Sequence, residues 1–412
     1  MSNSATFDAV VIGGGAAGFF AAITAAEQSD ASVLILEKSS QLLHKVKISG
    51  GGRCNVTHDC AEPRELSVNY PRGAKALIGS FHRFGPAETV EWFTGRGVML
   101  KTEADGRMFP TTDDSQTIVD ALLDAAAAVG VQVHTSEAVT SIVKTDTNSG
   151  DVFELQTTAG RTYAASSVVI ATGGTRVAAG AALAASLGHR LEPATPSLFT
   201  FKIKDPRLAG LSGLSVDPAD VAIAQSRLRS SGPVLITHTG LSGPGILKIS
   251  AWGARELAQR GYRFDISLNW LPDADPAAVI DEKRRSDAKR RLSSRSPFES
   301  IPKRLWQRLV EAAGIAEETT WSQLTKANAT QLLDELTDAT FTVVGKSTNK
   351  DEFVTCGGVA LDEIDFRTMQ SKLVDGLYFA GEVIDVDGVT GGFNFQNAWT
   401  TGFHAGSHIA AR

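Results

Sequence analysis

Short apolar runs flank an alanine-rich segment at the start of the chain. Residues 7–12 (FDAVVI) and 31–37 (ASVLILE) are apolar and rich in β-branched side chains, which predicts two buried strands. Residues 16–28 (AAGFFAAITAAEQ) lie between them and have the composition of a helix. A strand, a helix and a strand in this order form a βαβ unit with parallel strands. The pattern therefore predicts an α/β domain built on a parallel sheet.

The pattern changes further along the chain and then returns. A helix is predicted over residues 116–129, and short strand-like runs follow up to residue 171. Strands and turns prevail from 197 to 271, and helices prevail from 273 to 340. The buried-strand pattern returns near the C-terminus, before a helix from about Gln396. We therefore predict a discontinuous nucleotide-binding domain (residues 1–190 and 345–412), a β-rich insert domain (191–272) and a helical insert domain (273–344).

Composition and charge narrow the class of protein. The 40 basic and 46 acidic residues give a net charge of −6, which argues against nucleic acid as a partner. We find no apolar run long enough to cross a membrane and no secretory signal, so we expect a cytoplasmic protein without a membrane partner. The three cysteines, Cys54, Cys60 and Cys356, fit neither a disulfide framework nor zinc-ligand spacing. No metal site is expected.

A glycine fingerprint follows the first predicted strand. Gly13, Gly15 and Gly18 fit the pattern GxGxxG, and Glu37 ends the second strand. In such a turn the glycines allow a sharp bend, close approach of a pyrophosphate and tight helix packing. The carboxylate of Glu37 can accept hydrogen bonds from ribose hydroxyls, and its charge disfavours a 2′-phosphate. The alternative is a tight turn with a surface glutamate, but the three features in this order favour a dinucleotide.

Two distant segments favour FAD over NAD as that dinucleotide. Residues 167–174 (SVVIATGG) form a buried strand that runs into Gly173 and Gly174. Near the C-terminus, Gly381 and Asp385 follow a strand and precede a glycine-rich loop and a helix. A longer dinucleotide needs such a second loop, and a helix N-terminus at residues 396–398 can stabilise an anionic reduced flavin. The alternative is a packed terminal βα unit.

A third glycine-rich loop covers residues 49–55 (SGGGRCN). Its three consecutive glycines predict backbone close to a ligand, and Arg53 could pair with a pyrophosphate or a substrate. A flexible surface loop is the alternative. Cys54 has no neighbouring cysteine for a redox couple, so we interpret it as a packed structural residue.

Several longer stretches resemble one known family, the BaiN/aminoacetone-oxidase-like (YhiN-type) FAD-dependent flavoproteins. They are VVIGGGAAG (10–18), KISGGGRCNVT (47–57), GRMFP (106–110), VVIATGG (168–174), THTGLSGPGILKIS (237–250), VTCGGVALDEID (354–365) and GLYFAGEVIDVDGVTGGFNFQNAWTTG (376–402). The resemblance implies a glutathione-reductase-like, Rossmann-type FAD/NAD(P)-binding domain. It also implies an insert with a β-barrel-like part and a small helical part. Substrates differ among members, so none is carried over.

The resemblance assigns FAD-contact roles to residues in five segments of the chain. They are Gly13, Gly15, Gly18, Glu37, Gly52, Arg53, Asn55, Thr172, Gly381, Asp385, Asn394, Gln396 and Asn397. The candidate cofactor-binding set also includes Ala16, Ala17, Lys38, Cys54, Val139, Ala171, Gly173, Glu382 and Ala398. No catalytic residue is assigned.

Two features lie outside the predicted cofactor domain. Residues 283–308 hold ten basic and two acidic residues, which favours a solvated helix face over a nucleic-acid site because the pattern of aromatic residues among them does not suggest base stacking. Residues 237–245 form a turn-rich loop that could cover the flavin, with His238 as a proton donor or as a structural residue.

Together these patterns predict an FAD-dependent oxidoreductase that transfers hydride between a small organic substrate and flavin N5. NADH or NADPH is a candidate transient donor, and O₂ a candidate acceptor. Two alternatives stay open. One is a non-catalytic or redox-sensing flavoprotein that binds a partner through its basic insert, and the other is an NAD-dependent dehydrogenase without flavin. The oligomeric state is not predicted.

Overall fold

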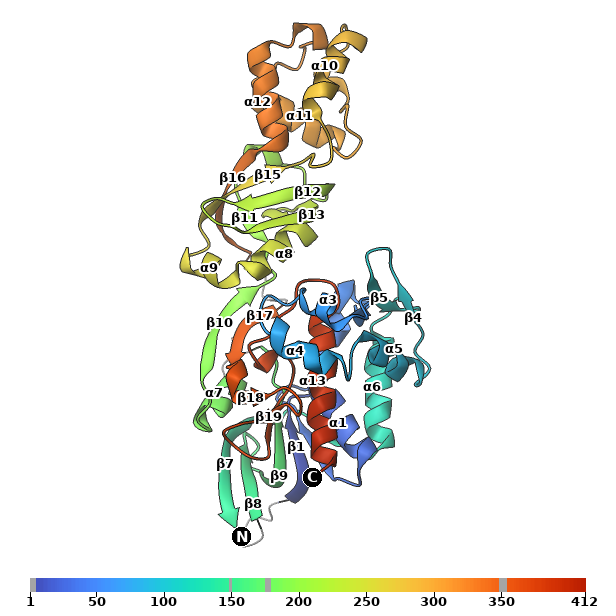
Figure 1. The fold of residues 1–412 in the computed structure, drawn as a ribbon, viewed down its shortest axis with the longest axis vertical. Helices are drawn as coiled ribbons and strands as arrows, with labels where there is room; N and C mark the ends of the chain where they lie inside the picture. The colour runs from blue at the N-terminus through green and yellow to red at the C-terminus, as the bar shows by residue number, and fades with distance from the viewer. Residues whose placement is uncertain (1–4, 148–149, 175–178, 348–353) are drawn as a thin grey trace. The chain divides into compact units, whose positions relative to one another are not determined.

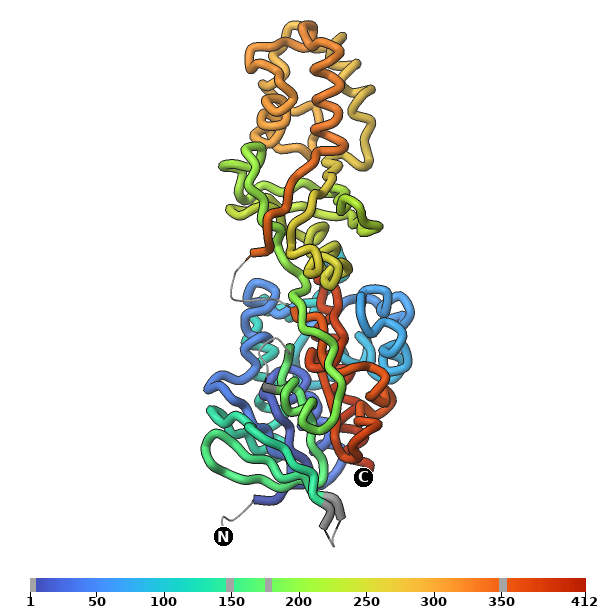
Figure 2. The backbone as a smooth tube through the Cα atoms, turned by 90° about the vertical axis from the view of Figure 1, so that its left-hand side faces the viewer, coloured from blue at the N-terminus to red at the C-terminus, as the bar shows by residue number. Residues whose placement is uncertain are grey.

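The chain folds into two compact units. A computed structural model describes residues 5–147, 150–174, 179–347 and 354–412. The first unit comprises Met1–Thr195 and Val354–Arg412, and the second comprises Pro196–Phe353. Figure 2 shows that the blue N-terminal part and the red C-terminal part belong to the same unit. The second unit is therefore an insertion into the first.

The first unit is built on a sheet with the strand order β18-β19-β20-β9-β1-β2-β6 (Figure 1). Strand β1 is parallel to both β2 and β9, so that Val10 is paired with Leu34 on one side and Val168 on the other. Strands β7 and β8 form an antiparallel hairpin that continues onto β9. The strands are β1 (Ala5–Ile12), β2 (Val33–Leu36), β6 (Gln132–His134), β7 (Val139–Thr147), β8 (Gly150–Thr157), β9 (Thr162–Ile170), β18 (Ile364–Asp365), β19 (Gln370–Ser371) and β20 (Leu377–Phe379). The predicted α/β class with a Rossmann-type domain is confirmed.

Helices and two small sheets complete the first unit. Helix α1 packs along α13, and a side chain at Gly406 would lie 2.4 Å from the Ala21 carbonyl oxygen, so glycine permits this close approach. The helices are α1 (Ala16–Gln28), α2 (His44–Ile48), α3 (Pro63–Ser67), α4 (Ala74–Phe81), α5 (Pro86–Thr94), α6 (Gln116–Ala128), α7 (Ala179–Ser186) and α13 (Phe393–Ala410), with 3₁₀ turns η1 (Ser49–Gly51), η6 (Leu361–Glu363) and η7 (Gly381–Val383). The small sheets are β3 (Thr57–His58), β5 (Arg107–Pro110) and β4 (Leu100–Thr102), and β10 (Leu191–Ser197) with β17 (Val354–Val359).

The second unit contains a closed six-stranded barrel with the order β11-β14-β13-β12-β15-β16. A side chain at Gly240 would lie 2.2 Å from the Phe201 carbonyl oxygen, so glycine lets β14 pack against β11. The loop that we considered as a lid thus contains a barrel strand, and His238 beside it is exposed. The barrel strands are β11 (Phe201–Ile203), β12 (Ser215–Ile223), β13 (Arg229–Ile236), β14 (Gly240–Ser242), β15 (Phe264–Asn269) and β16 (Ala339–Lys346).

Some helices pack against the barrel strands, and a group of helices lies beyond one end of the barrel (Figure 1). On α11 the buried residues Leu305, Trp306, Leu309 and Val310 recur at helical spacing, and they join one apolar core that also contains barrel residues such as Phe201. The helices are α8 (Pro244–Trp252), α9 (Ala254–Gln259), α10 (Pro276–Ser286), α11 (Lys303–Ala312) and α12 (Lys326–Thr337), with 3₁₀ turns η3 (Pro206–Leu208), η4 (Leu292–Ser294) and η5 (Trp321–Gln323). In the described part of the chain, no helix combines the length and apolarity needed to cross a membrane.

The structure shifts the segment boundaries that we expected from the sequence. Strand β10, which we placed in the β-rich insert, pairs with β17, and most of it belongs to the first unit. Strand β16 falls in the segment that we placed in a helical domain, yet it closes the barrel between β15 and β11. Helices α8 and α9 occupy a region where we expected strands and turns. The separation of barrel and helices into two domains stays a prediction.

Candidate functional site

The turn between β1 and α1 forms a cradle in which its glycines serve two purposes, packing and open space. A side chain at Gly13 would lie 2.5 Å from the Ala171 carbonyl oxygen, and one at Gly18 would lie 2.0 Å from the Gly13 carbonyl oxygen. Both glycines are therefore required by packing. A Cβ at Gly15 meets nothing within 4 Å. Ala16 and Ala17 form the first turn of α1, where backbone N–H groups favour an anion.

Glu37 connects this cradle to the next loop. One of its carboxylate oxygens accepts a hydrogen bond from the Gly14 N–H, and the other accepts from the Ser39 N–H, each at 2.8 Å. Each carboxylate oxygen keeps acceptor capacity for a further donor such as a ribose hydroxyl. The Glu137 N–H donates to the Glu37 carbonyl oxygen at 2.9 Å, which brings the buried Val139 at the start of β7 near this loop. Lys38 is exposed.

The end of β9 lies against the glycine turn. The Ala171 N–H donates to the Ile12 carbonyl oxygen at 2.9 Å, which aligns the two strand ends. Thr172 and Gly173 follow, both partly exposed, and the nearest atom to a side chain at Gly173 would be a Glu382 carboxylate oxygen at 3.9 Å. The predicted segments around residues 172 and 382 therefore lie together.

The C-terminal loop is fixed by carboxylates that accept backbone hydrogen bonds. Glu382 accepts from the Thr355 N–H at 2.7 Å and forms an ion pair with Lys45. The buried Asp385 accepts from the Gly357 N–H at 3.0 Å. The Gly381 N–H donates to the Thr401 hydroxyl at 2.9 Å, which attaches the loop to α13. These two carboxylates thus shape the loop.

Helix α13 begins at Phe393, with Gly392 as its N-cap, and not near Gln396 as the sequence suggested. Gln396 is buried, and its side-chain oxygen accepts from the Thr57 hydroxyl at 2.6 Å and from Thr89 at 3.1 Å. This side chain holds protein segments together and does not lie free for a ligand, because its amide nitrogen also donates to Thr400.

Three further predicted residues lie on this helix. Asn394 makes two hydrogen bonds with the Gly388 backbone, each at 2.8 Å, so it fixes the loop before the helix. Asn397 is buried, and its side-chain oxygen has no hydrogen-bond partner among the described residues. A buried acceptor of this kind needs a donor. Ala398 is buried beside it.

The third glycine-rich loop lies close to the start of α13. The Gly392 N–H donates to the Asn55 side chain at 2.9 Å in the amide orientation that satisfies both of its polar atoms. Side chains at Gly51 and Gly52 would meet nothing within 4 Å, as at Gly15. These glycines therefore leave open space beside the backbone.

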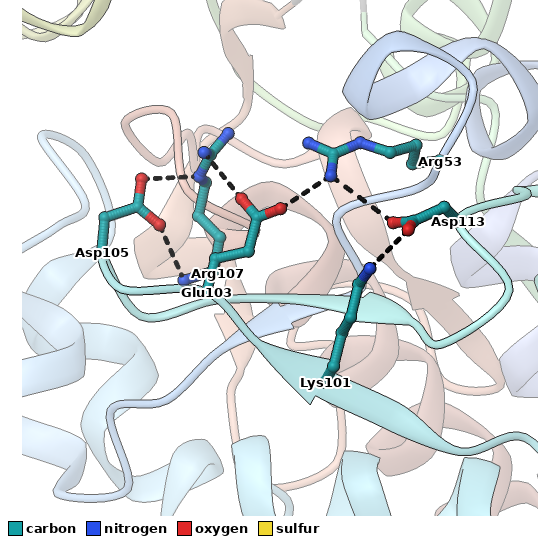
Figure 3. A network of polar contacts seen from close by, with 6 residues as sticks. All are labelled: Arg53, Lys101, Glu103, Asp105, Arg107 and Asp113. Atoms are coloured by element: carbon teal, nitrogen blue, oxygen red, sulfur yellow. Dashed lines mark hydrogen bonds and ion pairs between the residues drawn. The ribbon is translucent and has the colours of Figure 1, made fainter.

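Arg53 does not point to a free anion site. Its guanidinium is paired with Glu103 at 2.7 Å and Asp113 at 3.5 Å, and it lies 4.0 Å from the centre of the Phe109 ring. Figure 3 shows that these residues belong to a network on the β4–β5 hairpin that also includes Lys101, Asp105 and Arg107. We therefore interpret Arg53 as a residue that fixes the loop on this hairpin.

Cys54 is fully buried, and burial raises the pKa of its thiol to about 12. A thiol with this pKa is not a thiolate at neutral pH and does not act as a redox nucleophile. The geometry agrees with a structural role for this residue.

Residues outside the predicted set hold the site together. The Tyr70 hydroxyl donates to the Phe393 carbonyl oxygen at 2.6 Å, and Arg72 is paired with the fully buried Asp387. Asp387 lies two residues after Asp385, in a stretch that the resemblance covered, so its neighbourhood could have suggested it. Tyr70 and Arg72 carry no local sequence signal, because their partners lie more than 300 residues away.

These segments fit a long dinucleotide. The glycine positions 15, 51 and 52 leave space for a ligand, and Asn397 offers a buried acceptor. The helix N-terminus, the glycine turn and the acidic residue at the strand end together define a dinucleotide-binding flavoprotein. The chain is an FAD-dependent oxidoreductase. The chain belongs to the family described as "HI0933-like protein Rossmann domain", whose model matches residues 7–408.

Curated relatives and solved structures agree with this class. The chain is 32% identical to the ribosomal RNA dihydrouridine synthase of Escherichia coli K12, over 98% of both chains. It is 30% identical to the 3-dehydro-bile acid delta(4,6)-reductase of Clostridium scindens, again over 98% of both. The structure of 3-ketosteroid-delta4-(5alpha)-dehydrogenase from Rhodococcus jostii RHA1 covers 100% of this chain and 98% of its own, with a TM-score of 0.53 and 16% identity, which shows a shared fold.

These relatives correct one expectation. We excluded nucleic acid as a partner, but two curated relatives, from E. coli and Haemophilus influenzae, are named ribosomal RNA dihydrouridine synthase. The error has a physical cause, because net charge is a sum over the whole surface. The first unit has 18 basic and 27 acidic residues, a net −9, whereas the second has 22 basic and 19 acidic residues, a net +3.

Proposed function

We propose that this chain is an FAD-dependent reductase that saturates a carbon–carbon double bond conjugated with a carbonyl group, and that its substrate is uridine in ribosomal RNA. One observation carries the proposal. The E. coli relative named ribosomal RNA dihydrouridine synthase matches 98% of this chain at 32% identity, so the similarity extends over both units. The net positive charge of the second unit also supports an anionic substrate.

The names of the E. coli and C. scindens relatives describe one type of reaction. Dihydrouridine is uridine with a saturated C5–C6 bond, which in uridine is conjugated with the C4 carbonyl. A delta(4,6)-reductase acts on double bonds conjugated with a C3 ketone. Saturation of the bond next to the carbonyl adds a hydride to the β carbon and a proton to the α carbon. In the 4,6-diene the conjugation extends to C7, so the 6,7 bond is saturated by hydride addition at this δ carbon and protonation of the resulting dienolate. Reduced FAD, when bound, supplies the hydride from N5, and NADH or NADPH is the proposed source of electrons.

The chain itself contributes binding, orientation and electrostatics. Helix α13 begins at Phe393, and the backbone N–H groups of a first helical turn carry partial positive charge. This charge would stabilise negative charge on a reduced flavin ring bound at this turn. The acceptor on Asn397 and the turn around Gly15 are the proposed contacts for the rest of the cofactor.

The test is a direct product assay. Ribosomal RNA from an E. coli strain that lacks its own relative is incubated with the holoenzyme and NADPH or NADH, digested to nucleosides and analysed by mass spectrometry. We expect dihydrouridine to form, and the Gly15→Val variant, which should lack FAD, to form none. Active, reducible flavoprotein that yields no dihydrouridine in naked RNA or in ribosomal subunits would contradict the proposal.

A second candidate substrate is a steroid-like enone. It is favoured by the 30% identity to the bile acid reductase over 98% of the chain. A parallel assay with a 3-oxo-4,6-diene bile acid distinguishes the two substrates. Saturation of that compound is monitored by the decrease in its ultraviolet absorbance. Turnover of the diene without dihydrouridine formation would assign the chain to the second candidate.

A further inference from the structure

Ten of the basic residues in the second unit lie between residues 283 and 308, with only two acidic residues among them. This segment contains the end of α10, the turn η4 and the first half of α11. In Figure 1, α10 and α11 lie together with α12, beyond the barrel strands of the same unit. The positive charge of the second unit is therefore concentrated on a small helical part.

Some of this charge has a structural explanation. Lys283 is paired with Asp287 at 3.1 Å, Arg291 with Glu318 at 2.5 Å and Arg308 with Glu311 at 3.0 Å. Arg284 and Arg290 also approach aspartates, and Arg304 donates to the Gly210 carbonyl oxygen. Cations in the last turn of α10 also complement the helix dipole.

Four cations remain without such a partner. The side chains of Arg285, Lys289, Arg295 and Lys303 are exposed, and none makes a hydrogen bond or ion pair within the described residues. Lys303 and Arg304 occupy the first turn of α11, which contains no acidic residue. Positive charge at a helix N-terminus opposes the helix dipole, so helix stability explains neither cation, and Lys303 also has no partner that would explain it.

The α11 part of the face is hollowed. Arg304, Gln307 and Arg308 line a surface depression together with Ser293 of η4 and Gly210. Glu311 and Glu317 also line the depression, and Glu311 is paired with Arg308. The exposed side of α11 thus offers two guanidinium groups and two neutral polar side chains in one place.

The type of partner follows from which side chains are buried. The aromatic residues of this part, Phe298, Trp306 and Trp321, are in the core, so none is available to stack on bases. None of the exposed large apolar side chains in the described chain lies between residues 253 and 372, so this part offers no anchor for a lipid surface. Cations without aromatic or apolar neighbours suit a phosphate backbone.

We propose that Arg285, Lys289, Arg295, Lys303, Arg304 and Arg308 form an RNA docking face that contacts phosphates and does not read bases. The proposal rests on the RNA substrate proposed above and deepens it, because it assigns the surface that holds the RNA outside the flavin site. Helix α11, with ten residues, is about 15 Å long, and a duplex carries one negative charge per about 1.7 Å of its axis. A face of this size meets several phosphates at once.

The test compares two variants with equal loss of charge. In the face variant Arg285, Lys289, Arg295 and Lys303 are replaced by Gln. In the control variant Lys204, Arg227, Arg263 and Lys326 are replaced by Gln; these are exposed cations of the same unit without a hydrogen bond or ion pair of their side chains among the described residues. Binding of deproteinised ribosomal RNA to each holoenzyme is measured by filter retention at several salt concentrations.

We expect the face variant to bind about tenfold more weakly or worse at moderate salt, and the slope of log K against log salt to fall by about three. The control variant should bind within about twofold of the parent. The docking face would be overturned by an equal loss of RNA binding in both variants or by no loss in either. It would also be overturned if the parent does not bind RNA, or if the face variant loses binding only to vesicles of anionic lipid. Dihydrouridine formation is measured in parallel. Face-dependent binding without dihydrouridine would leave the docking face standing and reject the proposed substrate.

Discussion

Both units of this chain have an apolar core, but they differ in where prominent polar contacts lie. In the first unit, buried polar groups join segments that are far apart in the sequence, as in the pairs Tyr70–Phe393, Thr57–Gln396 and Arg72–Asp387. In the second unit, a continuous apolar core joins barrel and helices, and ion pairs such as Arg308–Glu311 lie at the surface. The contrast teaches that the cofactor site and the fold of the first unit depend on the same contacts, whereas the fold of the second unit does not depend on its unpaired surface cations, which can serve binding.

Glycines of the candidate site and glycines of the barrel are required for different reasons. At Gly15, Gly51 and Gly52 of the first unit, an added Cβ meets no atom within 4 Å. At Gly240 and Gly243 of the second unit, it would lie within 2.2 Å and 2.7 Å of backbone oxygens of neighbouring strands. At Gly51 and Gly52, φ values of +70° and +86° favour glycine, and at Gly15 the open space suits a ligand that passes close to the backbone. The second pair is explained by barrel closure.

The largest expected effect comes from two glycines of one turn. Gly18→Val should prevent folding of the first unit, because even its Cβ would lie 2.0 Å from the Gly13 carbonyl oxygen. Gly15→Val should give folded protein without FAD, because the new side chain enters open space where a pyrophosphate would lie. Absorbance at the flavin bands and circular dichroism separate the two outcomes. Full FAD occupancy in Gly15→Val would disprove the cradle.

The next largest effect is expected from the difference in stability contributed by a buried and an exposed ion pair. Arg72→Met leaves the carboxylate of the fully buried Asp387 without its cation, which should lower the free energy of unfolding by about 3–5 kcal/mol. Arg308→Met removes an exposed pair of the second unit and should change it by less than about 1 kcal/mol. Both free-energy changes are measured by unfolding each variant in urea and monitoring hydrogen exchange separately in each unit. Equal effects would remove the contrast between the units.

The difference between the units also explains what the sequence could predict. The β1–α1–β2 segment is local, so its apolar periodicity and glycine spacing predicted the strands, the turn and Glu37. The pairing of β10 with β17 and the closure of the barrel by β16 join residues more than 100 positions apart, and no local pattern reports such pairing.

The candidate site was predictable to a similar extent. Loop positions rich in glycine marked the segments that the structure brings together. The sequence could not show that Gln396 and Arg53 are already engaged by Thr57 and Glu103, because a side chain's partner is fixed only by the fold. The exclusion of RNA failed for a related reason, since a chain-wide charge hides two units of opposite sign.

A smaller effect is expected from acid, and it should act on the first unit. Burial lowers the pKa of His189 and of His404 below the ordinary value of 6.5. The neutral forms are therefore favoured by folding, and this stability is present above pH 6.5 and is lost as the pH falls below it. Each such histidine costs up to about 1.4 kcal/mol per pH unit between its two pKa values.

Hydrogen exchange and FAD fluorescence between pH 7.5 and 5.5 measure this loss. The first unit should open and release FAD before the second unit opens. In His404→Gln, an amide can still donate to the Ser80 carbonyl oxygen that His404 contacts at 3.0 Å, so the acid-dependent part of the loss should shrink. A second unit that opens first would contradict the assignment.

The smallest effect is expected at Cys54, which tests whether every buried polar group around the cofactor has a chemical role. The thiol is fully buried and its pKa is raised to about 12, so almost none is ionised at pH 8. Cys54→Ser should keep the rate of flavin reduction within about twofold, and an alkylating reagent should modify the partly exposed Cys60 of the native protein before Cys54. Peptide mass mapping and stopped-flow absorbance give both readouts. Cys54 lies in the loop that carries Arg53 and Asn55. A large loss of activity in a variant that still binds FAD would therefore mean that this loop takes part in the reaction, and the role of the first unit would then extend beyond cofactor binding.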